Sequence, residues 1–130
     1  MSTRKFIYWA ARIVAALIML QTLYFKFTGA PESVWIFTTV GMEPWGRIGV
    51  GVLELIAAVL LLINATAWLG AALGAGLMAG AIFMHLTILG IGVEGDGGYL
   101  FALAWLVMVC CAYVLFENRS AILLRFRAGH

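Results

Sequence analysis

The sequence predicts an all-α integral membrane protein: a bundle of four transmembrane helices with a short interfacial helix on its outer side. Of its 130 residues, 65% are hydrophobic and only 11% are charged. A soluble domain of this length could not bury so much apolar surface in one core. We expect spans at residues 6–27, 43–63, 68–89 and 99–116, each near the roughly 20 residues that a crossing helix needs. Together they form a single membrane domain, with a basic amphipathic tail at 117–130.

The charges beside these spans predict their orientation. An even number of spans places both termini on one side, and that side is basic, with Arg4, Lys5, Arg119, Arg125 and Arg127. The positive-inside rule then puts both termini in the cytoplasm of a bacterial-type inner (plasma) membrane. The net charge of +2 is small and no basic patch with interleaved aromatic residues is present, so a nucleic-acid partner is not indicated.

The first span is longer than the 7–15 apolar residues of a signal peptide, so we expect it to stay uncleaved. Two structures fit the connection that follows it. Pro31 and Glu32 suit a first helical turn and Gly41 suits a helix end, which favours a short amphipathic helix on the outer surface. An ordered loop with aromatic anchors fits the same residues equally well.

Glycine pairs four residues apart mark the third span, at Gly70 and Gly74 and again at Gly76 and Gly80. Small residues at this spacing let helices approach closely, and packing inside the bundle is favoured over a dimer face.

The acidic outer loop at 90–98 and the adjacent pair Cys110–Cys111 are weak signals for chemistry. Glu94 and Asp96 are too few ligands to assign a metal. The cysteines lack the CxxC spacing of a disulfide exchanger and are expected to pack as apolar residues.

Glu54 is the strongest functional signal in the chain. It lies roughly 16 Å along its helix from Glu43, close to the midplane of the bilayer. An acid at that depth costs about 2.5–3.5 kcal/mol and usually faces a bundle interior or a wet cavity.

The direction of each helix limits which polar side chains can reach Glu54. Helical side chains tilt toward their own N-terminus, so Glu54 leans outward while Gln21, Lys26 and His85 lean toward the membrane middle. We therefore predict a polar pocket of these four residues in the outer half of the bundle. Arg47 and Glu43 are expected at the outer rim, with Arg47 leaning toward water. Arg12 is expected to snorkel toward the cytoplasm.

Two stretches, LQTLYFKFTGAPESVWIFTTVGMEPWGRIGVGVLELIAAVLLLI and MHLTILGIGVEGDGG, resemble the DoxX family of small four-helix membrane proteins. The most specific matches are Lys26, the segment 41–47 before the second span, Glu54 and His85. Some relatives are membrane subunits of thiosulfate:quinone oxidoreductases, and others belong to oxidoreductase complexes in oxidative-stress defence. Remote relatives include quinone-coupled thiol oxidoreductases, whose CxxC motif this chain lacks, and a receptor assembly chaperone.

The leading hypothesis is an accessory subunit of a membrane oxidoreductase system that faces lipid or quinone, with quinone as the candidate cofactor. An oxidoreductase or larger membrane complex is then the candidate protein partner, and membrane lipids surround the bundle. No complete catalytic constellation is identifiable, so an enzymatic activity is not assigned. The alternative is a structural or assembly protein whose buried polar residues only lock the helices together. A proton-coupled transporter is disfavoured because the chain has no inverted repeat.

Overall fold

The computed structural model describes residues 2–92, 95 and 97–128, and side chains in this set as far as Leu124. Every regular element in that part of the chain is helical. The elements are α1 (Thr3–Thr28), α2 (Pro31–Thr39), α3 (Trp45–Leu62), a 3₁₀ turn η1 (Asn64–Thr66), α4 (Ala67–Met84), a π-helical turn η2 (His85–Leu89), α5 (Tyr99–Glu117) and α6 (Arg119–Ala128).

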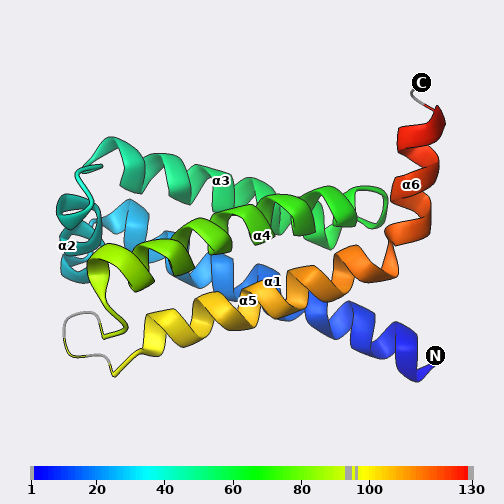
Figure 1. The fold of residues 1–130 in the computed structure, drawn as a ribbon, viewed down its shortest axis with the longest axis horizontal. Helices are drawn as coiled ribbons and strands as arrows, with labels where there is room; N and C mark the ends of the chain where they lie inside the picture. Colours follow the sequence, from blue (N-terminus) through cyan, green and yellow to red (C-terminus); the bar gives the residue numbers. More distant parts are fainter. Residues whose placement is uncertain (1, 93–94, 96, 129–130) are drawn as a thin grey trace.

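Four of these helical stretches, α1, α3, α4 with its flanking turns, and α5, are long and apolar enough to cross a membrane. The predicted fold class, a polytopic four-helix membrane bundle, is confirmed. α1 packs on α3 and α5, and α4 packs on the same two helices, so neighbours around the bundle run antiparallel (Figure 1).

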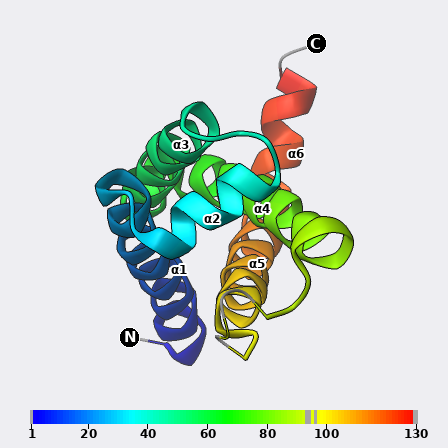
Figure 2. The same cartoon turned by 90° about the vertical axis from the view of Figure 1, so that its left-hand side faces the viewer.

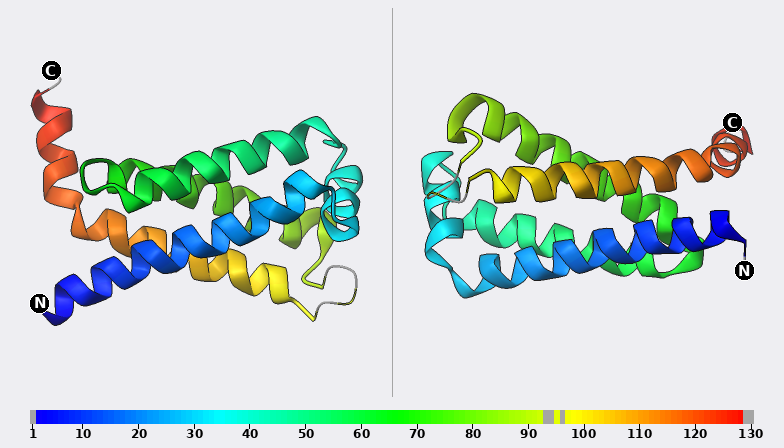
Figure 3. Two further views of the ribbon diagram at one scale, coloured as in Figure 1. Left: turned by 180° about the vertical axis from the view of Figure 1, so that it is seen from behind. Right: turned by 90° about the horizontal axis from the view of Figure 1, so that it is seen from below.

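The two ends of the bundle differ. Both chain termini lie at one end, which we call the terminal end, and α6 turns away from the bundle axis there (Figures 1 and 3). At the opposite end, which we call the α2 end, α2 crosses over the tops of the long helices (Figure 2). The connection between the first two spans is thus a helix, with Pro31 at its start and Gly41, at φ 79°, after its last turn.

The half of the bundle nearer the termini is close-packed around small side chains. Ala15, Ala58, Val107 and Cys111 are fully buried there. A Cβ added at Gly70 would lie 2.6 Å from the backbone nitrogen of Leu61, so the backbones of α4 and α3 are in contact at that point. The first glycine pair of the third span therefore serves packing inside the bundle.

Two arginines tie α1 and α3 together at opposite ends. Arg12, on α1, donates from Nε to the carbonyl of Leu61 (2.6 Å) and from Nη1 to Oδ1 of Asn64 (3.0 Å), at the end of α3. Arg47, on α3, donates from Nη1 to the carbonyl of Lys26, at the end of α1. Each guanidinium lies where the partner helix has carbonyls without helical donors and a negative dipole end.

The prediction that Arg12 snorkels into water is wrong, because the residue is only 1% exposed and its guanidinium lies 3.8 Å from the centre of the Trp9 ring. Arg47 leans toward the start of α3, the direction predicted, but it meets a carboxylate there and not water. Its side chain is 12% exposed and pairs with Glu43, with Nε 2.9 Å from Oε1. In both cases an unsatisfied helix end attracts the arginine more strongly than the nearby solvent does.

Candidate functional site: a cavity beneath α2

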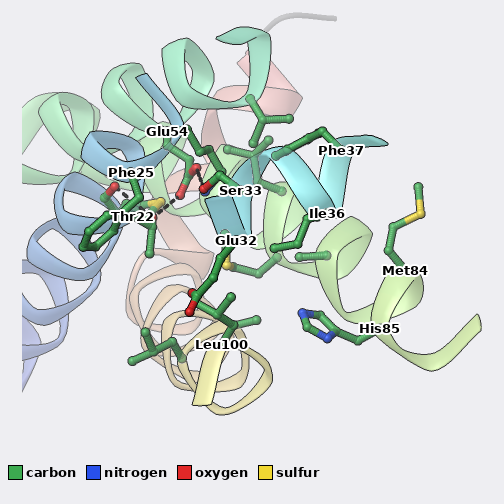
Figure 4. Close-up of a pocket in the computed structure, with 18 of the residues that line it drawn as sticks. Thr22, Phe25, Glu32, Ser33, Ile36, Phe37, Glu54, Met84, His85 and Leu100 are labelled. Atoms are coloured by element: carbon green, nitrogen blue, oxygen red, sulfur yellow. Dashed lines mark hydrogen bonds and ion pairs between the residues drawn. The ribbon is translucent and has the colours of Figure 1, made fainter. Parts of the chain in front are cut away.

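A cavity of about 800 Å³ occupies the α2 half of the bundle. Its walls come from all four long helices, and α2 covers it (Figure 4). It begins where the close-packed core ends, at the level of Met19, Met78 and Ala104, which contribute to both. The lining is mostly apolar, with the polar side chains Gln21, Thr22, Lys26, Glu32, Ser33, Glu54, His85 and Tyr99.

Glu54 lies in the α3 wall of this cavity and is 1% exposed. It shares a helix face with the buried residues Gly51, Ala58 and Leu61, so the pattern that buries α3 also turns the carboxyl group inward. Its Oε1 lies 2.7 Å from Nζ of Lys26, and its Oε2 accepts a hydrogen bond of 2.8 Å from the Thr22 hydroxyl.

Lys26 reaches Glu54 from the last turn of α1, and its side chain is 16% exposed. Thr22 lies one turn earlier on the same helix face, since residues four apart in a helix are neighbours. Its hydroxyl also lies 3.0 Å from the carbonyl of Met19. α1 therefore presents an ammonium and a hydroxyl together to one carboxylate of α3.

His85 lies on η2 and is 5% exposed. Its Nδ1 lies 2.9 Å from the carbonyl oxygen of Gly90, and its ring packs against that of Phe101 with 5.4 Å between centroids. Figure 4 shows the imidazole apart from Glu54, across the space under α2, and no direct contact joins the two side chains in the described part of the chain. The structure thus brings Lys26 to Glu54 and holds His85 on a separate wall.

Gln21 does not join this cluster. It is exposed and lines the cavity wall, and none of the hydrogen bonds among the described residues reaches from it to Glu54. Thr22, which sequence reasoning missed, takes that place. The sequence did carry a signal for Thr22. One buried face of α1 follows the helical spacing of Ala15, Met19, Thr22 and Lys26, and Gln21 falls outside it.

The rim residues Arg47 and Glu43 form an ion pair at the start of α3 and reach the cavity only through the Lys26 carbonyl. The described residues contain no group of three histidine, cysteine or acidic side chains that could hold a metal ion. The acidic-loop residues Glu94 and Asp96 lie outside the described part of the chain. Cys110 and Cys111 are free thiols in α5, and Cys111 is fully buried.

The chain matches a known protein family over more than half of its length. Residues 7–87 match the DoxX family. The chain belongs to the DoxX family. The matched segment of this DoxX-family protein includes Lys26, Glu54 and His85, and it ends before α5.

No curated protein and no solved structure matches the chain. The cavity of this DoxX-family protein offers a buried ion pair on one wall, an imidazole on another and an apolar volume between them. Such an arrangement can bind a ligand with a small polar head group and an apolar body.

Proposed function

We propose that this DoxX-family protein is an accessory subunit of a membrane oxidoreductase system, and that its cavity receives the head group of a quinone or quinone-like lipid. The cavity volume of about 800 Å³ falls in the range of small-molecule sites. The observation that carries the proposal is the placement of buried polar groups, Glu54 with Lys26 on one wall and His85 on another, in an otherwise apolar space.

These groups suit a ligand that exchanges protons. A quinone that is reduced to a quinol takes up electrons and protons in equal number. In the proposal the electrons come from a partner redox protein, while the carboxyl group of Glu54 and the imidazole of His85 accept or release protons near the head group. The apolar lining would hold the ring and exclude water from it.

Titration with decylubiquinone tests this function. Wild type in detergent should bind the quinone, and Glu54→Gln should bind it about tenfold more weakly, because a charge that orients the polar wall is lost. Glu117→Gln is the matched control. It also neutralises an acid that forms an ion pair, here with Arg4 at 2.6 Å, but at the terminal end and away from the cavity. Equal affinity of Glu54→Gln and wild type, or no binding by either, would remove the proposal.

A structural or assembly role is the second candidate, and one observation favours it. Both oxygens of Glu54 already have partners on α1, so the pair can act as a lock between two helices without any ligand. In that case the Glu54→Gln substitution lowers thermal stability and recovery of a protein partner together, and wild type binds no quinone.

We also propose the orientation that the positive-inside rule predicts, with both termini in the cytoplasm of a bacterial-type inner membrane and the α2 end on the opposite side. Arg4, Lys5 and Arg119 flank the terminal end, whereas Lys26 and Arg47 are the basic residues near the α2 end.

Fusions to the C-terminus test this orientation. A fluorescent protein that matures only in the cytoplasm should fluoresce, and an alkaline phosphatase that folds only outside it should be inactive. The reverse pattern would contradict the orientation.

A further inference from the structure

The hydrogen bond between His85 and Gly90 fixes which ring nitrogen carries the proton. A backbone carbonyl oxygen can only accept a hydrogen bond, so Nδ1, 2.9 Å away, must be the donor. A neutral imidazole carries a single ring proton, which leaves Nε2 with a free lone pair. His85 thus presents a hydrogen-bond acceptor on the side of the ring away from Gly90.

This acceptor is available to a ligand. Nε2 has no hydrogen-bond partner among the residues that the structure describes, although His85 is 5% exposed and lines the cavity. The ring is held in place by the Gly90 bond and by Phe101, which in turn packs edge-on against Trp105 with 6.3 Å between centroids. The lone pair is therefore oriented before any ligand arrives.

The other polar side chains of the cavity include both acceptors and donors. Glu54 adds a carboxylate, and Glu32 adds another from α2. The Thr22 hydroxyl is already donated, whereas Lys26 has further N–H groups besides the one that faces Glu54, and Ser33 and Tyr99 carry hydroxyls. The contact that distinguishes the two redox forms of a ligand is therefore the one at His85. A quinone offers only carbonyl oxygens, which are acceptors, and these would face the imidazole lone pair without a shared proton. A hydroquinone offers hydroxyl groups, which can donate to it.

We infer that the cavity selects the reduced, hydroxyl-bearing form of its ligand, with one hydroquinone hydroxyl donating a hydrogen bond to Nε2 of His85. This inference rests on the proposed function and adds the redox state of the bound molecule. The site then prefers the quinol over the quinone, because an unpaired buried acceptor is left only in the quinone complex. His85 is a specificity-determining residue that fixes this preference.

The experiment compares decylubiquinol with decylubiquinone on the same detergent-purified protein at pH 8, without oxygen. The quinol should bind about tenfold more tightly, the effect of a single neutral hydrogen bond together with the relief of an unpaired acceptor. Binding of both forms with equal affinity, or tighter binding of the quinone, would overturn the inference while leaving the proposed function standing. Binding of neither form overturns both.

His85→Asn provides a matched variant. The asparagine amide can still donate to the Gly90 carbonyl in place of Nδ1, but nothing replaces Nε2. This variant should keep its thermal stability and lose the preference, so that the quinol-to-quinone affinity ratio falls toward one. A ratio that stays at the wild-type value would overturn the role of His85. The wild-type ratio itself decides the main inference should the variant not fold.

Discussion

The carboxyl group of Glu54 is held by donors from one neighbouring helix, and this explains how an acid can lie so deep in an apolar bundle. Lys26 supplies a charge and Thr22 a hydroxyl, each within 2.8 Å of a different oxygen. A charge buried without partners costs several kcal/mol, whereas a paired and hydrogen-bonded one costs far less. The stability of the α1–α3 contact should therefore depend on both members of the pair.

Removing only the lysine should be worse than removing both charges. Lys26→Met leaves the buried carboxylate without its counter-ion and should destabilise the protein by about 3–5 kcal/mol. The double variant Lys26→Met/Glu54→Gln should recover more than half of that loss, because a neutral amide can still accept from Thr22. Thermal unfolding in detergent measures the series.

The control for this series is Lys5→Met, which removes an exposed lysine from the first turns of α1 at the terminal end. It should leave the melting temperature unchanged. Strictly additive effects of the Lys26 and Glu54 substitutions would contradict an energetic coupling between them.

At the scale of helices, α4 uses its glycines for two purposes. Gly70 and Gly74 lie where α4 meets α3 and the core, and a Cβ at Gly74 would lie 2.9 Å from Sγ of Cys111. Gly76 and Gly80 have open space around them and line the cavity. One face of the helix thus allows close approach of neighbours, while the other leaves the cavity wall without side chains.

Alanine substitutions separate these purposes. Gly70→Ala should lower the melting temperature strongly, because its Cβ would collide with the backbone of α3, which cannot move aside as a flexible side chain would. Gly80→Ala meets no atom within 4 Å and should be neutral or stabilising by up to about 1 kcal/mol, the helix-propensity difference. Equal losses at both positions would contradict the assignment of the two faces.

Sequence patterns were sufficient for the features that depend on one helix at a time. Hydropathy predicts the four apolar helices, and the depth and tilt of side chains bring Lys26 toward Glu54. The role of that pair in binding stays a prediction.

Features that depend on how helices rotate or end could not be read in this way. Thr22 replaces Gln21 beside Glu54 because the rotation of α1 is set by its packing. Arg12 and Arg47 turn to helix ends whose positions only the folded bundle defines. The π-helical turn at His85–Leu89 changes backbone hydrogen bonding, and hydropathy carries no signal for it.

The whole molecule is closed at one end and hollow at the other. At the terminal end, α1 and α5 are joined by Arg4 with Glu117 (2.6 Å) and by Asn118, which donates to the Tyr8 hydroxyl (2.8 Å). The close-packed core lies next to these bonds. At the α2 end, the cavity lies among all four long helices.

The contacts of Arg12 and Arg47 between α1 and α3 bear on how the bundle can adjust to a ligand. Because Arg12 and Arg47 join α1 to α3 near both ends of α3, we expect these two helices to keep their relative position when a ligand enters the cavity. Any adjustment to a ligand beneath α2 is then expected in α4 and α5, and least at the close-packed terminal end.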